Sequence, residues 1–323
     1  MFSERILRSR CVYMHLMGGL GNQLFQLAAG ISVSHSRKHN LFIDETYGIY
    51  RRNLDSQADF RSFDNANLLA NSLFHKKYRI ISRMFGLLTR LSLSNKNRKS
   101  TEFFTSALRH FLSIFLTFRE FKLIRIWSAS NIGFEEVPKS KTSQFLVGYF
   151  QTYRFASESH VYERLKALKI ESKSIDKIAL EAEWEKPLIV HVRLGDYLQE
   201  TTFGILGPDY YRRALDSIFD PNRYMKIWVF SDDIDEARKL IPNKYSEFVR
   251  WFPQTNESSA ETLEKMRLGR AYIIANSTFS WWAAFLSKTP HAPTIAPSPW
   301  FQGMDEPNDL IPPYWERLAR ELN

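Results

Sequence analysis

The sequence contains a single cysteine, Cys11, among its 323 residues. One cysteine excludes an intramolecular disulfide framework and a zinc site built from cysteines. It fits a reducing compartment, where disulfides are rare. Hydrophobic residues make up 44% of the chain and charged residues 24%. These values are ordinary for a globular protein, so a disordered or low-complexity chain is excluded.

The sequence also lacks an apolar run long enough to cross a bilayer. Residues 11–36 contain no Asp, Glu, Lys or Arg and follow a basic start, as in a signal peptide or anchor. However, GGLGNQ at 18–23 interrupts this stretch after an apolar block of seven residues. A membrane-spanning helix needs about 20 mostly apolar residues. We therefore expect no transmembrane segment and a protein that lies in, or faces, the cytoplasm.

Acidic residues are scarce in one part of the chain. Between Lys76 and Arg125 there are 12 Lys and Arg but two acids, whereas the rest of the chain has 32 basic and 33 acidic residues. The net charge of +9 therefore comes from one basic insert, at about 70–130, in an otherwise nearly neutral protein.

Residues 79–93 of this insert have the pattern of a basic amphipathic helix. Apolar side chains between Ile80 and Leu91 share one face, and Arg79, Arg83 and Arg90 lie opposite. Two interpretations stay open: a helix packed on the core, or one bound to an anionic membrane surface. The second places the protein peripherally on the inner face of a membrane. Binding to nucleic acid is disfavoured, because the charge is not spread over aromatic-lined sheets.

The rest of the chain alternates apolar runs with helical spacings of three and four residues. The first half predicts strands at 11–17, 41–44 and 144–150, and helices at 23–36 and 155–169. The second half predicts strands at 188–193, 226–233 and 294–300, helices at 209–218, 234–241 and 313–322, and a strand–turn–helix at 271–287. This order is typical of an α/β protein with two Rossmann-like domains facing across a cleft. We place them at 1–180 and 181–323, joined in the charged segment 171–187.

A glycine-rich turn follows the first strand. Because Gly19 and Gly21 lie between a strand and a helix, backbone N–H groups there can approach a ligand. Asn22 and Gln23 add amides that can donate to hydroxyls or phosphates. A plain tight turn is the alternative, since the lysine of a phosphate-binding P-loop is missing.

The segment HVRLGDY carries stronger evidence of a ligand. His191 and Arg193 share one face at the carboxyl end of a strand, where open α/β sheets bind ligands. Arginine suits bidentate recognition of phosphate, and Asp196 can orient it or cap the next turn. An ordinary ion pair at a strand end is the alternative.

Two further polar turns lie in the second half. After the strand at 226–233, capping of the next helix by Ser231 or Asp232 is favoured over a magnesium or manganese site, and one of the acids can bind a nucleotide ribose. The turn at 276–280 opens an apolar helix whose first N–H groups suit phosphate. An arginine and a helix start in the same half predict a diphosphate ligand. Trp281 and Trp282 are expected in the core.

Five segments, in this order, resemble the α-1,2-fucosyltransferases of glycosyltransferase family 11: GGLGNQLFQLAAG, GYFQTYRF, HVRLGDY, GPDYYRRAL and IIANSTFSWWAAFL. The resemblance implies a GT-B fold and GDP-β-L-fucose as the donor, with inversion at the anomeric carbon and no metal or other cofactor. The implied acceptor is the 2-hydroxyl of galactose in a surface polysaccharide such as O-antigen. If the basic insert binds a membrane surface, the glycan acceptor is expected to be linked to a lipid.

The resemblance and the residue patterns above together assign roles to residues. Arg193, His191 and Asn22 are the candidate catalytic residues, with Arg193 on the diphosphate. The set expected to bind the donor is Gly19, Gly21, Gln23, Arg193, Asp196, Ser231, Asp232, Asn276, Ser277, Thr278, Phe279 and Ser280. The general base stays unassigned. The alternatives are another GDP-sugar transferase, such as one forming an α-1,6 linkage, and a non-catalytic protein that binds membrane or polysaccharide.

Overall fold

The computed structural model describes residues 10–45, 59–69, 71–72, 124–195, 204–253 and 257–320. The chain divides into two compact units. One consists of Met1–Arg61 and Asn65–Leu168, and the other of Ser62–Asp64 and Lys169–Asn323. The basic amphipathic helix predicted at 79–93 lies outside the described residues.

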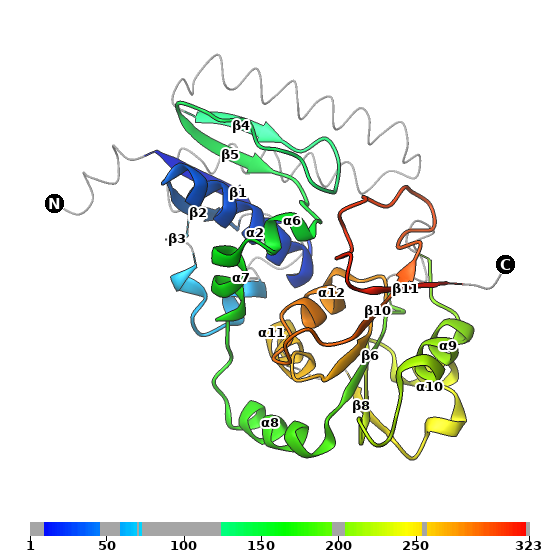
Figure 1. Cartoon of the computed structure of the whole chain (residues 1–323). Helices are drawn as coiled ribbons and strands as arrows, with labels where there is room; N and C mark the ends of the chain where they lie inside the picture. The colour runs from blue at the N-terminus through cyan, green and yellow to red at the C-terminus, as the bar shows by residue number, and fades with distance from the viewer. Residues whose placement is uncertain are drawn as a thin grey trace. The chain divides into compact units, whose positions relative to one another are not determined.

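The first unit contains a five-stranded parallel sheet in the order β3-β2-β1-β5-β4 (Figure 1). Its strands are β1 (Cys11–His15), β2 (Asn40–Asp44), β3 (Asn71–Ser72), β4 (Ile124–Ser128) and β5 (Ser143–Val147). Its helices are α2 (Leu20–Arg37), α6 (Tyr153–Ala156) and α7 (Ser159–Lys166), with short 3-10 helices η1 (Asp59–Ser62) and η2 (Ala66–Leu68). The single helix predicted at 155–169 is two helices, because Glu158 has extended backbone angles.

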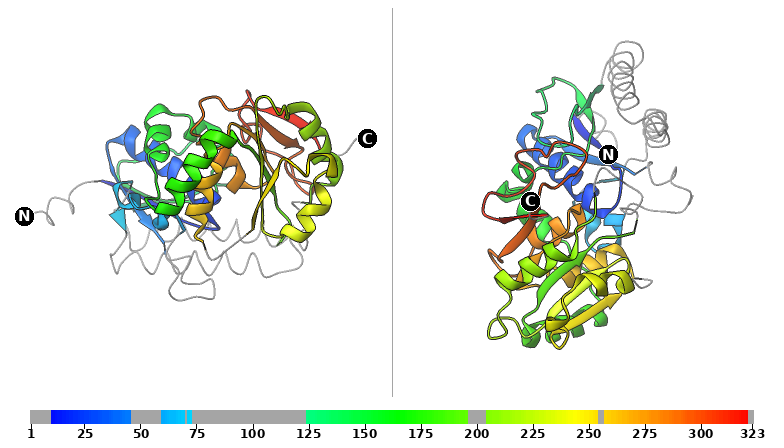
Figure 2. Two further views of the ribbon diagram at one scale, coloured as in Figure 1. Left: turned by 90° about the horizontal axis from the view of Figure 1, so that it is seen from below. Right: turned by 90° about the vertical axis from the view of Figure 1, so that its right-hand side faces the viewer.

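The second unit contains a six-stranded parallel sheet in the order β11-β10-β9-β6-β7-β8. Its strands are β6 (Leu188–Val192), β7 (Ile227–Ser231), β8 (Val249–Pro253), β9 (Ala271–Ile273), β10 (Thr294–Ser298) and β11 (Glu316–Ala319). Its helices are α8 (Lys173–Glu185), α9 (Pro208–Ile218), α10 (Ile234–Leu240), α11 (Ser259–Met266) and α12 (Thr278–Phe285). Helices α9 and α10 cover one face of this sheet, and α8, α11 and α12 cover the other (Figures 1 and 2).

Two parallel-sheet units confirm the predicted α/β class. The predicted domain boundary between residues 180 and 181 falls inside α8. This charged segment is helical because the side chain of Ser172 accepts a hydrogen bond from the Ile175 N–H, and apolar residues line a buried face. Within the described ranges, no helix is both long and apolar enough to cross a membrane.

The terminal helix predicted at 313–322 is wrong. Residues Glu316–Ala319 form strand β11, which pairs in parallel with β10 at the edge of the sheet. The Arg317 guanidinium donates to the Pro297 carbonyl at 2.8 Å and to Glu306 Oε1 at 2.6 Å. These partners come from other parts of the chain, so the tertiary contacts override the local helical pattern.

A buried ion cluster joins α11 to the end of α12. The Glu264 side chain is 3% exposed, and its carboxylate lies 2.7 Å from Arg267 Nη1 and 2.5 Å from Lys288 Nζ. Arg267 also donates from Nε to the Leu286 carbonyl at 3.0 Å. Removal of the carboxylate would break both ion pairs, one of which is made by the buried Arg267 guanidinium.

We therefore predict that Glu264→Ala lowers the free energy of unfolding by about 3 kcal/mol or more. The matched control is Glu183→Ala, because the Glu183 side chain is 72% exposed and its pair with Arg270 is solvated. That control should change the free energy by less than about 1 kcal/mol. Urea unfolding of both variants makes the measurement, and equal small effects would contradict the importance of the cluster.

Candidate active site

The carboxyl ends of β6 and β7 carry the main charged residues of the second unit's candidate site. The register pairs Val192 with Ser231, so the residues that follow the two strands are neighbours. Arg193 Nη1 lies 3.1 Å from Asp232 Oδ2. The Arg193 side chain is 32% exposed and that of Asp232 is 12% exposed. The carboxylate therefore holds the guanidinium from one side and leaves part of it accessible.

Asp232 also fixes the backbone that follows β6. Its Oδ1 accepts a hydrogen bond from the Leu194 N–H at 2.9 Å. A Cβ on Gly195 would lie 2.5 Å from Asp232 Oδ2, so a larger residue here would displace this carboxylate. This role of Asp232 was not predicted from the sequence. The pattern that indicates it is a charged residue directly after each of two strands, Arg193 after β6 and Asp232 after β7. Asp196 lies outside the described residues.

The helix cap predicted at Ser231 or Asp232 is wrong. Asp233 caps α10, and its Oδ1 accepts from the Glu236 N–H at 3.1 Å. The Ser231 hydroxyl donates to the Asp233 carbonyl and accepts from its N–H, which closes a turn before the helix begins. The Ser231 hydroxyl therefore forms hydrogen bonds with the protein's own backbone. No group of three or more His, Cys, Asp or Glu that could hold a metal occurs within the residues that the structure describes.

His191 connects the end of β6 to the start of α12. Its side chain is buried and its ring centroid lies 6.1 Å from that of Phe279. The Tyr211 hydroxyl donates to the His191 carbonyl at 3.2 Å. Burial, together with the Arg193 charge, lowers the pKa of His191 to about 3. The ring is therefore neutral near pH 7 and is a weak proton acceptor, because an efficient general base has a pKa near the working pH.

The turn at 276–280 forms a helix start, as predicted, and its side chains divide into two kinds. Ser277 caps α12, with Oγ accepting from the Phe279 N–H at 3.3 Å, and Thr278 and Phe279 are partly exposed. By contrast, the buried Asn276 amide donates to the Gly204 carbonyl at 3.2 Å. The Ser280 hydroxyl is fully buried and donates to the Ala275 and Ser277 carbonyls.

The Ser231 and Ser280 hydroxyls and the Asn276 amide group bond to the protein's own backbone, so these side chains hold the turns in place. Their contacts with the donor stay predictions. Arg193, Asp232, Thr278 and Phe279 are partly exposed, and the positive end of α12 lies at Thr278 and Phe279. Trp281 and Trp282 are fully buried in the core, as predicted.

The glycine-rich turn of the first unit forms the start of α2. Gly18 has a φ of 73°, and a Cβ there would lie 2.6 Å from Asn22 Nδ2, so only glycine fits. Gly19 is exposed and its carbonyl accepts from the N–H groups of Asn22 and Gln23. Gly21 is buried within the first turn of the helix, where it packs against the core.

The two amides of this turn behave differently. Gln23 Nε2 donates to the Gly18 carbonyl at 2.9 Å, and its Oε1 accepts from the Phe60 N–H at 3.1 Å. This side chain therefore holds η1 against α2, and its contact with the donor stays a prediction. Asn22 is partly exposed, and its Oδ1 accepts from Gln151 Nε2 at 2.9 Å.

A buried pair at the carboxyl ends of two strands of the first sheet was also not predicted from the sequence. His15 ends β1 and Asp44 ends β2, and the register pairs the two residues. His15 Nδ1 lies 2.5 Å from Asp44 Oδ2, and both side chains are almost completely buried. Each of the two neighbouring strands ends in a polar residue, and this pattern could have indicated the pair.

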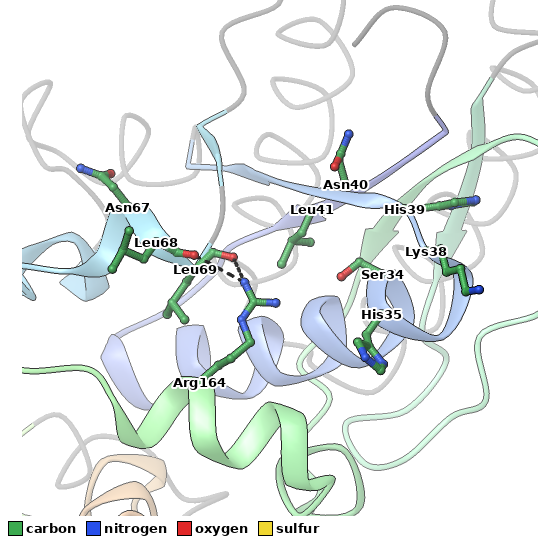
Figure 3. A pocket seen from close by; sticks show the side chains of 10 residues that line it. All are labelled: Ser34, His35, Lys38, His39, Asn40, Leu41, Asn67, Leu68, Leu69 and Arg164. Carbon is green, nitrogen blue, oxygen red and sulfur yellow. Dashed lines mark hydrogen bonds between the residues drawn. The ribbon is translucent and has the colours of Figure 1, made fainter. Parts of the chain in front are cut away.

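A cavity of about 470 Å³ lies elsewhere in the first unit (Figure 3). It is formed by the last turn of α2, the start of β2, η2 and Arg164 of α7. These segments lie at the edge of the sheet opposite to the glycine-rich turn. None of the predicted site residues lines this cavity.

The sequence model of the family described as "Glycosyl transferase family 11" matches residues 11–307. The chain therefore belongs to this family of glycosyltransferases. It is 26% identical to an "Alpha-1,2-colitosyltransferase" of Escherichia coli, over 96% of this chain and 99% of that protein. It is also 26% identical to the "O-antigen biosynthesis glycosyltransferase WbnK" of Escherichia coli, over 90% of this chain and 95% of that protein.

The solved structures that resemble the chain include fucosyltransferases. The fucosyltransferase NodZ from Bradyrhizobium is 18% identical, with a TM-score of 0.48 over 85% of this chain and 92% of that chain. A FUT1 variant of Arabidopsis thaliana in complex with GDP is 11% identical, with a TM-score of 0.48 over 89% of this chain and 73% of that chain.

The buried, neutral His191 predicts a loss of stability in acid. Its pKa is about 3 in the folded protein against 6.5 for a free ring, so the unfolded chain takes up the proton first as the pH falls. The free energy of unfolding should fall by up to about 1.4 kcal/mol per pH unit below about pH 6.5. Denaturant unfolding at a series of pH values between pH 7.5 and pH 4.5 measures the slope.

In His191→Gln this slope should become smaller, because the titrating group is gone. His291→Asn is the control: His291 is exposed with a φ of 52°, a conformation that Asn tolerates. The control should keep the wild-type slope. If His191→Gln also keeps it, the inferred low pKa is contradicted.

Proposed function

We propose that this glycosyltransferase transfers L-fucose from GDP-β-L-fucose to the 2-hydroxyl of a galactose-type acceptor, with inversion at the anomeric carbon. The acceptor belongs to a bacterial surface polysaccharide such as O-antigen. One relative is named for an α-1,2 transfer and another for O-antigen biosynthesis, which supports this linkage and setting. The five sequence segments that resemble α-1,2-fucosyltransferases support fucose as the sugar.

The observation that carries the proposal is the Arg193–Asp232 pair at the carboxyl ends of β6 and β7. When the bond from fucose to GDP breaks, negative charge grows on the departing diphosphate. An oriented guanidinium stabilises that charge through bidentate hydrogen bonds. The N-terminus of α12 lies close by, because Phe279 in its first turn packs near His191, and a helix start adds further positive potential. We propose that these groups act without a metal ion.

The acceptor hydroxyl loses its proton as its oxygen bonds to the anomeric carbon of fucose. The depressed pKa of His191 disfavours this residue as the base, because its ring holds a proton only weakly at neutral pH. We therefore assign His191 a packing role between β6 and α12. Arg193 keeps the role of stabilising the leaving group, and Asn22 is placed on the acceptor side.

Transfer of colitose is the second candidate function. The relative named as an α-1,2-colitosyltransferase matches almost the full length of this chain. Colitose lacks one hydroxyl that fucose has, so the two donors differ by a single hydrogen-bonding group. The linkage and the diphosphate chemistry would be the same for both donors.

The test is incubation of the purified protein with GDP-fucose or GDP-colitose and a panel of galactose-ended acceptors, with and without EDTA. We expect an α-1,2-fucosylated product, identified by NMR, that forms equally well in EDTA. An α-1,6 linkage, or transfer of colitose alone, would contradict the proposed function. A strict metal requirement would contradict the role given to Arg193 and α12.

Arg193→Ala should lower kcat about 100-fold or more, because the charge-assisted contact to the diphosphate is lost. Arg193→Lys should restore little activity, because an ammonium group cannot form the bidentate contact. Arg212→Ala is the control, since Arg212 lies on α9, is 46% exposed and pairs with Asp209. Initial-rate kinetics on folded variants make the comparison. Near-normal turnover in Arg193→Ala would place the donor elsewhere.

A further inference from the structure

Gln151 follows an unusual turn at the end of β5. Phe150 precedes it with a φ of 52°, a left-handed conformation that bulky residues rarely adopt. Packing holds Phe150 there: its buried ring stacks on Trp127 at 5.8 Å and meets Phe155 edge-on at 6.2 Å. Backbone strain that the surrounding core maintains is characteristic of functional sites.

The backbone on both sides of Gln151 is also fixed. The Gln151 N–H donates to the Ile132 carbonyl at 2.6 Å, and the Thr152 N–H donates to the Phe150 carbonyl at 2.8 Å. Thr152 then caps α6, with its Oγ1 accepting from the Arg154 N–H at 3.1 Å. The side chain of Gln151 is thus presented from a rigid corner between a strand and a helix.

One end of the Gln151 carboxamide is bonded and the other is not. Nε2 donates to Asn22 Oδ1 at 2.9 Å. Oε1 is buried and has no hydrogen-bond partner within the described part of the chain, and the residue as a whole is 8% exposed. A buried acceptor without a partner is costly, and in native proteins such groups call for a specific explanation.

The position of this amide in the sheet points to a ligand. Asn22 follows β1 and Gln151 follows β5, and these strands are adjacent and parallel. The start of α2 and α6 lie side by side beyond these strands (Figure 1). Both side chains therefore lie at the carboxyl edge, where open α/β sheets bind ligands.

Gln144 is a comparable buried glutamine, but it lies at the opposite edge of the same sheet. It is also buried, its Nε2 donates to the Pro138 carbonyl at 3.1 Å, and its Oε1 also has no partner in the described residues. However, Gln144 lies at the amino end of β5, opposite Val12. It is therefore a matched control for Gln151, on the strand that leads to the Gln151 turn.

We propose that Gln151 binds the acceptor sugar. Its Oε1 accepts a hydrogen bond from a hydroxyl of the galactose-type acceptor, and its Nε2 holds Asn22 in place beside the same sugar. The inference rests on the proposed function and assigns the segment GYFQTYRF to acceptor recognition. A sugar hydroxyl suits this atom because it donates a hydrogen bond and is small.

The first test compares wild type, Gln151→Leu and Gln144→Leu in steady-state kinetics with GDP-fucose and methyl β-galactoside. Gln151→Leu should raise the acceptor KM about tenfold, the effect of one lost hydrogen bond, and change the donor KM less than about twofold. Gln144→Leu should shift Tm but leave the acceptor KM at the wild-type value. Gln151→Glu retains the size and an acceptor oxygen, so its acceptor KM should rise less than that of Gln151→Leu.

The second test identifies the hydroxyl. Methyl β-galactosides that lack the hydroxyl at C3, C4 or C6 are compared with the parent sugar. With the wild type, one of them should lose about tenfold in kcat/KM, and with Gln151→Leu the same deletion should have little further effect. That non-additivity is the signature of a direct contact, which a purely structural glutamine would not produce.

The outcomes separate the inference from the proposed function. If the wild type transfers fucose but both leucine variants change Tm alone, a buried water satisfies Oε1 and the inference is overturned. If Gln151→Leu does not fold, the wild type still decides, because a series in which no deoxygalactoside loses kcat/KM overturns the inference as well. If the wild type uses no galactoside at all, the proposed function fails, and the inference fails with it.

Discussion

The carboxylate of Asp232 makes the interaction on which the candidate donor site depends. It lies 3.1 Å from the Arg193 guanidinium, accepts the Leu194 N–H at 2.9 Å and would be displaced by a Cβ at Gly195. These contacts exist because β6 and β7 are adjacent parallel strands in register, so the residues after their ends meet. The register of the sheet thus orients the one cation that the proposed chemistry needs.

The alternation of strands and helices could be predicted because it depends on apolar spacing within short segments. The turn before α12 and the strand ends at His191 and Ser231 followed from the same local patterns. The prediction of a terminal helix was wrong because β11 is stabilised by pairing with β10 and by the contacts of Arg317. The partners in these contacts come from other parts of the chain. Local periodicity carries no information on such partners.

The roles of single polar side chains were less predictable than the elements that carry them. Ser280 and Gln23 stand in turns that suit a ligand, yet their polar atoms bond to the protein's own backbone. The direction of a side chain depends on rotamers and neighbours that a sequence does not display. Conversely, Gln151 became a candidate only when its burial, the backbone of Phe150 and the contact to Asn22 were known.

The central claim is that the donor's diphosphate binds at the carboxyl end of β6 and at the start of α12. Hydrogen–deuterium exchange with and without GDP measures this directly in the unmodified protein. If the claim is right, GDP slows exchange in peptides containing Arg193–Gly195 and Thr278–Trp281 and leaves the opposite edge, around Met225–Ile227, unchanged. Slowed exchange confined to other segments, such as those around the cavity in Figure 3, would contradict it.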